Sequence, residues 1–241
     1  MNKHRIIAFA VVAAALVFGI GAESFAASKV KKSAKFTVRI ENISNADGLV
    51  TEGGVKYPFA ISPGFYIVNH KKNYFFDEGK SAGAALETQA EDGNPEEFSK
   101  KLLTKVGSIY TGIFNKPVGA EMPAPILPGG AYEFTFTATE GMKLDLISMF
   151  GQSNDLFYAP KESFELFDAS GNAISGDVTD KFFLWDAGTE VNQAPGIGAD
   201  QAPRQKEKNT GTTEGGVVRL VKDGFSYPDT KDVLRVTITA Q

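Results

Sequence analysis

Apolar and polar side chains alternate with a period of two along several parts of the chain. Residues 36–41 and 132–139 show this alternation most clearly, and it is typical of antiparallel strands with one buried face. The Ser170-Gly171-Asn172 sequence predicts a hairpin turn. Further runs rich in aromatic and β-branched residues predict strands at 144–150, 164–167, 182–185, 217–221 and 233–239.

One helix is indicated clearly by its start signals. Asn94 can cap the helix, Pro95 suits its first position, and Glu97 stands where a capping-box acid would. These residues predict a helix over 95–106 whose apolar stripe packs on a sheet. A second, shorter helix is expected over 82–89. Many strands with one or two short helices predict a mainly β fold, an antiparallel β-sandwich with loops gathered at its ends.

Two irregular segments interrupt this pattern. Residues 192–214 are polar, lack periodicity and are rich in Gly, Pro, Gln and Lys, and residues 123–130 form a second irregular connection. A loop as long as 192–214 inside a compact β domain is usually functional or mobile. No internal repeat and no second domain boundary is visible, so we expect one domain over 35–241, preceded by a short linker at 27–34.

The first residues have the parts of a secretory signal peptide. Lys3 and Arg5 form a basic segment, an apolar run follows over 6–20, and small residues precede a cleavage point after Ala26. An uncleaved anchor is the alternative, although the apolar run is short for a bilayer span. We expect residues 1–26 to be removed and the mature protein, which has no other transmembrane candidate, to be secreted or periplasmic.

Composition narrows the chemistry that the mature chain can carry. The 241 residues include no cysteine, so neither a disulfide framework nor a lipidated N-terminal cysteine is possible. Removing the signal peptide takes away Lys3, Arg5 and Glu23, so the formal net charge changes from −4 to −5. A mildly acidic chain disfavours nucleic acid as a partner and leaves carboxylates available for cations.

Catalytic signals are weak in this sequence. After signal cleavage His70 is the only histidine, and no nucleophile elbow lies near it. With one histidine and no cysteine, zinc and copper sites are disfavoured, and no glycine-rich phosphate-binding motif is present. We therefore expect a protein without enzymatic activity. An envelope hydrolase that uses two of the many carboxylates stays open as an alternative.

The run Trp185-Asp186-Ala187-Gly188-Thr189-Glu190 carries the most specific chemistry. An apolar strand ends here in two carboxylates around a glycine, and such a loop can hold Ca²⁺, which takes six to eight oxygen ligands. Asp155 follows the predicted strand at 144–150, and its loop would meet this one if both strands belong to one sandwich. Three carboxylates so close repel unless a cation lies between them. Asn154 and Asn192 are further possible oxygen donors, and an ordinary acidic turn is the alternative.

Several segments also follow one another in a recognisable order. They are Ile147-Ser148-Met149-Phe150, Ser153-Asn154-Asp155, Trp185 to Glu190, Glu214-Gly215-Gly216 and Arg235-Val236-Thr237-Ile238. This order resembles the spondin N-terminal domain, a family named for the animal matrix protein F-spondin and found also in exported bacterial proteins. Ser62-Pro63-Gly64 and Ala90 to Pro95 look like the bacterial branch of that family. The resemblance covers about residues 35–241, and its Trp-Asp-Ala-Gly-Thr-acid element is the most specific part.

The resemblance implies a C2-like β-sandwich that binds Ca²⁺ through Asp155, Asp186 and Glu190. Two residues depart from the animal pattern, because Glu190 replaces an Asp and Leu156 replaces an aromatic residue. We expect an exported binding or adhesion module whose loop end is organised by Ca²⁺ and whose partner is a glycan, a protein or a lipid surface. A structural domain whose acidic loop binds no metal is the remaining alternative, and Trp185 is expected in the core in either case.

Overall fold

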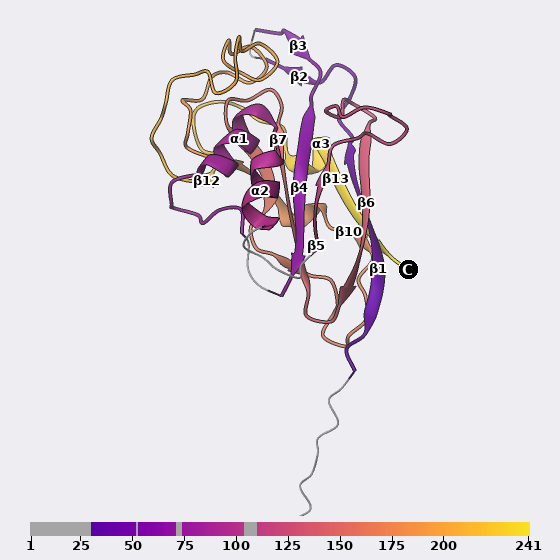
Figure 1. Ribbon diagram of the computed structural model, residues 1–241. Helices are drawn as coiled ribbons and strands as arrows, with labels where there is room; N and C mark the ends of the chain where they lie inside the picture. Colours follow the sequence, from indigo (N-terminus) through magenta and orange to yellow (C-terminus); the bar gives the residue numbers. More distant parts are fainter. Residues whose placement is uncertain (1–29, 52, 71–73, 104–109) are drawn as a thin grey trace, which may run out of the picture. The chain divides into compact units, whose positions relative to one another are not determined.

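Two antiparallel β-sheets pack against each other and form the frame of the protein (Figure 1). Residues 31–241 form one compact unit. The predicted signal peptide and the last residues of the helix predicted at 95–106 lie outside the described residues. The computed structural model describes residues 30–51, 53–70, 74–103 and 110–241. Within these ranges the predicted fold class, mainly β and antiparallel, is confirmed.

The smaller sheet contains four strands in the order β10-β13-β1-β6. In its register, Val38 of β1 lies opposite Ile238 of β13 and Phe134 of β6, so the alternating apolar residues of the three long strands share one face. This is the arrangement that the period-two pattern predicts. The bounds are Gly176–Asp177 for β10, Leu234–Ala240 for β13, Ser33–Asn42 for β1 and Ala131–Thr139 for β6.

The larger sheet contains seven strands, in the order β12-β11-β8-β7-β4-β5 with β9 paired to β7. Strands β7 and β8 are buried along nearly their whole length, which indicates that both faces of this sheet are covered. The bounds are Ile61–Asn69 for β4, Tyr110–Phe114 for β5, Lys143–Phe150 for β7, Leu156–Pro160 for β8, Phe164–Glu165 for β9, Phe182–Asp186 for β11 and Arg219–Leu220 for β12. A separate hairpin pairs β2 with β3, at Leu49–Val50 and Lys56–Tyr57.

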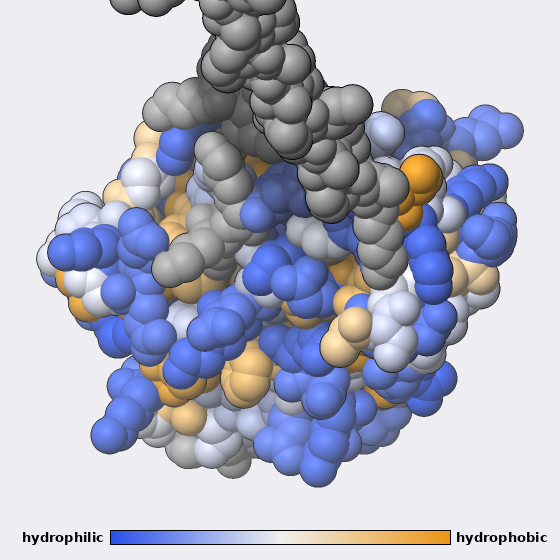
Figure 2. Space-filling view, turned by 90° about the horizontal axis from the view of Figure 1, so that it is seen from below, coloured by the Kyte–Doolittle hydropathy of each residue, from blue (hydrophilic) through white to orange (hydrophobic). Residues whose placement is uncertain are grey.

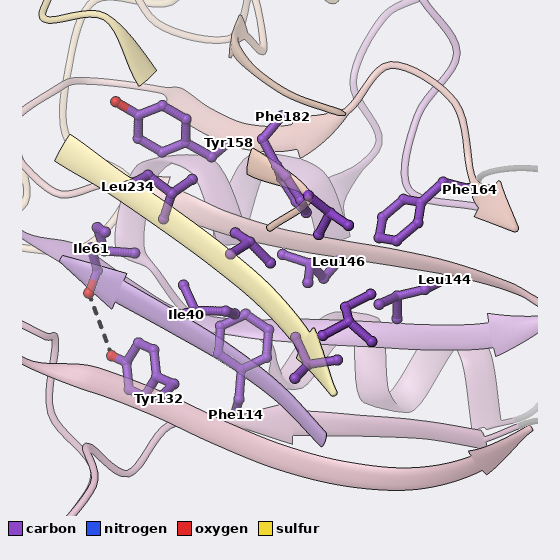
Figure 3. Close-up of a cluster of buried hydrophobic side chains, with 14 of the residues drawn as sticks. Ile40, Ile61, Phe114, Tyr132, Leu144, Leu146, Tyr158, Phe164, Phe182 and Leu234 are labelled. Carbon is purple, nitrogen blue, oxygen red and sulfur yellow. Dashed lines mark hydrogen bonds between the residues drawn. The ribbon is translucent and has the colours of Figure 1, made fainter. Parts of the chain in front are cut away.

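The main hydrophobic core lies between the two sheets. Ile40 and Leu234 of the smaller sheet cluster with Leu146 of the larger sheet, as Figure 3 shows. Tyr132 brings a polar group into this core, and its hydroxyl donates a hydrogen bond to the Ala124 carbonyl at 2.6 Å and lies 3.4 Å from the Ile61 carbonyl, the contact drawn in Figure 3. A buried hydroxyl needs such a partner to offset the loss of its contacts with water.

Two helices cover the other face of the larger sheet. Helix α1 spans Ala84–Asp92 and helix α2 spans Glu96–Leu103, and both lie on the side of β4 and β7 away from the smaller sheet (Figure 1). A second hydrophobic cluster joins Leu86 and Phe98 of these helices to Trp185 of the sheet. The fold is therefore a β-sandwich with a helical layer on one face. Trp185 is fully buried in the core, as predicted.

The start of α2 matches its predicted cap. The Asn94 side-chain oxygen accepts a hydrogen bond from the Glu96 backbone amide at 3.0 Å. The Glu97 carboxylate, predicted to close a capping box, pairs with Lys100 at 2.8 Å. The remaining short elements are a 3₁₀ turn at Thr179–Lys181 and helix α3 at Thr230–Val233.

The sequence pattern does not predict strands β4, β5 and β8. Strand β4 contains Pro63 and Gly64, residues that usually weaken strands, and its register against β7 shifts between Ile61 and Gly64. The two strands approach so closely there that a Cβ on Gly64 would lie 2.0 Å from the Ile147 carbonyl oxygen. Strand β8 shows no alternation because it is buried throughout.

Figure 2 shows one face of the molecule, on which hydrophilic residues predominate and hydrophobic residues lie scattered between them. Single exposed hydrophobic side chains of this kind are ordinary on protein surfaces. Within the described ranges, no helix is both long enough and apolar enough to cross a membrane.

Asp145 on β7 is a fully buried acid in the larger sheet. One of its carboxylate oxygens accepts a hydrogen bond from Ser163, and the other has no partner among the described residues. Burial raises the pKa of Asp145 from 3.8 to about 6, although the bond from Ser163 and the charge of Lys143 oppose this shift. Because the folded pKa lies above the unfolded one, the folded state loses stability as the pH rises through this interval.

We expect Asp145→Asn to increase the free energy of unfolding at pH 7.5 by about 2–3 kcal/mol, since the amide keeps an acceptor for Ser163 and carries no charge to desolvate. At pH 3.5 the variant and the wild type should be nearly equal, because both side chains are then mostly neutral. Urea denaturation at the two pH values measures the difference, with the exposed Asp232→Asn as the matched control. Equal stabilities at pH 7.5 would contradict this prediction.

Candidate functional site

Acidic side chains gather where strands β8 and β11 lie side by side. The two strands are antiparallel neighbours, with Asp186 opposite Leu156. Asp155 directly precedes Leu156, so this pairing places Asp155 next to Asp186. The loop after β11 then turns over the start of β8, because the Ala187 amide donates a hydrogen bond to the Asp155 carbonyl at 3.2 Å. The structure thus brings Asp155 and Asp186 together.

Asp155 is fully buried and only half of its carboxylate is satisfied. Its Oδ2 accepts hydrogen bonds from the Thr189 amide at 2.7 Å, the Thr189 hydroxyl at 3.1 Å and the Glu190 amide at 3.1 Å. Its Oδ1 has no partner among the described residues. Burial raises the pKa of Asp155, and the bonds from Glu190 and Thr189 lower it. One buried oxygen is therefore available to a ligand.

Asp186 closes the turn at the end of β11. Its Oδ1 accepts a hydrogen bond from the Gly188 amide at 2.7 Å, while its Oδ2 accepts one from the Asn192 amide group at 3.0 Å and one from Arg219 at 2.8 Å. Burial and then the charge of Asp155 raise the pKa of Asp186 to about 7, although Arg219 lowers it. Both oxygens of Asp186 thus have partners, unlike those of Asp155.

Glu214 joins these two acids from the end of the long loop. One carboxylate oxygen each from Asp155, Asp186 and Glu214 lie within 4.8 Å of one another. Arg219 bridges two of them, because its Nη2 lies 2.8 Å from Asp186 and 2.7 Å from Glu214. Sequence reasoning did not assign Glu214 to the site. The only feature of the sequence that singled out Glu214 was its place in the order of spondin-like motifs, and that order does not predict its distance from Asp155.

Glu190 is also buried, but its carboxylate lies outside that group of three. Its Oε2 accepts a hydrogen bond from the Asn154 amide group at 3.3 Å. Burial raises the pKa of Glu190 to about 7, the bond from Asn154 lowers it, and the charges of Asp155, Asp200 and Asp92 raise it further. Of the three acids predicted as ligands, the structure therefore brings the carboxylates of Asp155 and Asp186 into one group and leaves that of Glu190 outside it.

Glu91 is a further buried acid at this place, and it comes from helix α1. Its side chain is 2% exposed, and its Oε2 has no partner among the described residues. Burial raises the pKa of Glu91 to about 8, a side-chain hydrogen bond with Thr189 lowers it, and the charge of Glu190 raises it. Sequence reasoning missed Glu91 because it follows the end of the helix predicted at 82–89, and no local pattern shows where a helix meets a distant loop.

Polar side chains hold the long segment 192–214 in a defined arrangement. Gln201 is fully buried, and its amide group donates hydrogen bonds to the Ala194 carbonyl at 2.9 Å and the Gln193 carbonyl at 3.3 Å. The segment also contacts helix α1, where Gln205 donates a hydrogen bond to Asp92 at 2.8 Å. The long loop thus covers the acidic side chains and connects them to the helical layer.

The ligand atoms at this site suit a hard cation. The carboxylate and amide side chains described offer oxygen ligands, which Ca²⁺ prefers, whereas Arg219 supplies a positive charge to Asp186 and Glu214. Three of the buried oxygens that lack a partner among the described residues belong to side chains of this region, namely Asp155 Oδ1, Glu91 Oε2 and Asn192 Oδ1. Buried polar atoms are rarely left in this condition in folded proteins. The residues present therefore fit a bound calcium ion.

Comparison with known proteins does not assign the chain to a family. No protein-family model matches the chain, and no curated protein matches its sequence. The resemblance to the spondin domain therefore depends on the motifs quoted above and stays a prediction.

Gly188 shapes the turn that places Asp186 against the loop. Its φ is +70°, which favours glycine, and a Cβ there would lie 2.7 Å from the Val217 amide nitrogen. Gly215 is a matched control, because its φ is +68° but no atom lies within 4 Å of a Cβ built on it. We expect Gly215→Ala to cost about 1 kcal/mol of stability and Gly188→Ala about 1–3 kcal/mol more, because only the second adds a clash.

Thermal and urea unfolding of the two glycine variants measure this difference. Equal losses of stability would show that the backbone near Gly188 moves freely enough to accept a side chain. The tight turn around Asp186 would then not be a constraint on the site.

Proposed function

We propose that this protein is an exported, non-enzymatic binding or adhesion module whose loop end is organised by Ca²⁺. The observation that carries this proposal is Asp155, a fully buried carboxylate that lies beside Asp186 and Glu190 and has one oxygen without a partner among the described residues. A carboxylate in such a position costs folding free energy unless a cation compensates its charge. The resemblance to the spondin domain points to the same three acids.

Repulsion among these acids supports a cation. Burial, together with the Asp155 charge, raises the pKa of both Asp186 and Glu190 to about 7, well above the usual range of carboxylic acids. A divalent cation has the opposite effect, because its charge favours the ionised carboxylates. Ca²⁺ is therefore expected to stabilise the folded protein more at pH 8 than at pH 6, where protons compete for the same oxygens.

Arg219 bears on where the cation would lie. It pairs with Asp186 and Glu214, whereas no ion pair is seen for Asp155 or Glu190 among the described residues. We therefore place the cation on the Asp155 side of the group that Asp155, Asp186 and Glu214 form, because Asp155 Oδ1 is the oxygen there without a partner among the described residues. Oxygen atoms of the surrounding loop and water would complete the coordination of Ca²⁺.

The proposed role follows from the place of the site in the fold. Loops at the end of a β-sandwich are held by the sheets, and they are a common place for binding. A cation under the loop 192–214 would hold that loop in one arrangement and leave its outer surface for a partner. We infer export to the periplasm or the medium from the predicted signal peptide, and a partner among glycans, proteins or lipid surfaces found there.

Calorimetric titration of Ca²⁺ into the mature chain, residues 27–241, tests the cation site. The wild type is expected to bind, and Asp155→Asn, which keeps the shape but removes the charge, is expected to lose binding. At a free Ca²⁺ concentration of about 100 times Kd, thermal melts should show about 2.7 kcal/mol more stability than in EDTA. Asp232→Asn is the exposed control and should match the wild type. No binding by the wild type would sink the proposed function.

The non-enzymatic class has a separate test. Incubation of the protein with purified cell-wall glycan should release no more reducing ends or peptide than buffer alone, with or without Ca²⁺. Turnover that Asp155→Asn abolishes while its circular dichroism stays unchanged would favour the envelope hydrolase instead.

A further inference from the structure

Arg219 brings a positive charge to the acidic group that Asp155, Asp186 and Glu214 form. Its Nη2 donates hydrogen bonds to Asp186 at 2.8 Å and to Glu214 at 2.7 Å. Asp155 forms no ion pair within the described part of the chain. When ionised, the three carboxylates therefore carry more negative charge than one guanidinium balances.

Strand pairing holds Arg219 against Asp186. The two residues lie directly opposite each other in the register of β11 and β12. Strand β12 has only two residues and lies at the edge of the larger sheet, and the Arg219 side chain is 33% exposed. A further contact, from Nη1 to the Val217 carbonyl, is long for a hydrogen bond at 3.3 Å. The guanidinium can therefore turn into the solvent while the backbone of β12 keeps its pairing.

A cation at this site needs the carboxylates that Arg219 contacts. Two oxygens that bind one Ca²⁺ at about 2.4 Å lie at most about 4.8 Å apart. One oxygen from each of the three acids meets this limit. Asp186 Oδ2 already accepts bonds from Arg219 and Asn192, which occupy its two lone pairs. This oxygen can bind a metal only after one donor leaves, and Arg219 is the donor whose charge a cation repels.

We infer that Arg219 is an internal competitor of the bound Ca²⁺, and that its guanidinium turns away from Asp186 and Glu214 when the ion binds. This inference rests on the proposed function, because it concerns the cation at the same site. Before the ion binds, Arg219 offsets the repulsion between the two carboxylates that it bridges. The ion takes over this role, and the loss of the contacts with Arg219 reduces its affinity.

This competition places the affinity in a range that suits an exported protein. The number of charged ligands is one of the properties that set Ca²⁺ affinity, and extracellular modules bind Ca²⁺ with a Kd of about 10⁻⁴ to 10⁻³ M. A positive side chain on two of the acids lowers the net negative charge that the ion meets. Arg219 thus keeps the site among the weaker ones, which fill where Ca²⁺ is abundant.

Calorimetric titration of Ca²⁺ into the mature wild type and into Arg219→Gln tests this inference. We expect Arg219→Gln to bind about tenfold more tightly, because it removes the competing charge and leaves the three acids in place. Arg219→Lys keeps the charge and should bind less tightly than Arg219→Gln. Arg39→Gln is the matched control and should bind like the wild type. Arg39 also bridges two acids, Glu41 at 3.1 Å and Glu133 at 3.5 Å, but it belongs to the smaller sheet.

Thermal unfolding gives a second measurement. In EDTA, Arg219→Gln should unfold at a lower temperature than the wild type, because Asp186 and Glu214 lose their partner. Saturating Ca²⁺ should stabilise Arg219→Gln more than the wild type, since tenfold tighter binding corresponds to about 1.4 kcal/mol. If Arg219→Gln does not fold in EDTA, folding on addition of Ca²⁺ supports the inference. A variant that stays unfolded at every Ca²⁺ concentration would overturn it, because the ion would then not replace the guanidinium.

The results of the titrations distinguish this inference from the proposed function. If the wild type binds Ca²⁺ and Arg219→Gln binds it with equal or lower affinity, the inference is overturned and the proposed function stands. If Arg219→Gln binds and the wild type does not, the proposed function is overturned and competition by Arg219 is supported. If neither protein binds Ca²⁺, both are overturned.

Discussion

Burial of both faces of the seven-stranded sheet is the constraint on which the rest of the structure depends. One face packs against the smaller sheet and the other against helices α1 and α2. Strand β8 and the part of β11 before Asp186 can therefore be apolar, and the acids lie at the strand ends. The acids meet there because Asp186 ends β11 and Asp155 precedes β8, so the arrangement of the site is a consequence of strand pairing.

The helical layer covers the site from the face opposite the smaller sheet. A sandwich alone would leave the loop acids open to water, where their charges are screened. Helix α1 and the segment 192–214 cover them, and burial then raises the pKa of several carboxylic acids at once. Glu91 adds one more buried acid from the covering layer. The same packing that stabilises the fold through apolar contacts thus creates an electrostatic cost at one place, which a divalent cation is suited to remove.

Local sequence patterns predicted the parts of this structure that depend on local physics. Alternation identified β1 and β6, a β-branched run identified β13, and the cap signals at Asn94 identified the start of α2, whereas β10 was not predicted. Strand β4 was not predicted because Pro63 and Gly64 are unusual inside a strand. Gly64 is explained by the close approach of β4 to β7, which leaves no room for a side chain. The sequence predicted the proximity of Asp155 and Asp186 from the loops that follow the strands at 144–150 and 182–185, whereas the structure produces it through the pairing of β11 with β8, a strand that the sequence pattern did not predict. The places of Glu91 and Glu214 depend on how a helix and a long loop pack, which no local pattern contains.

Trp185 is the single tryptophan of the chain, and its position gives the protein an internal optical reporter. The indole is fully buried, its N–H donates a hydrogen bond to the Ala159 carbonyl at 3.1 Å, and Phe76 packs on it with ring centroids 4.8 Å apart. It directly precedes Asp186, so one peptide bond separates the fluorophore from the acidic turn. Intrinsic tryptophan emission therefore comes from one known place, between the sheet and its helical cover, and needs no label to be assigned.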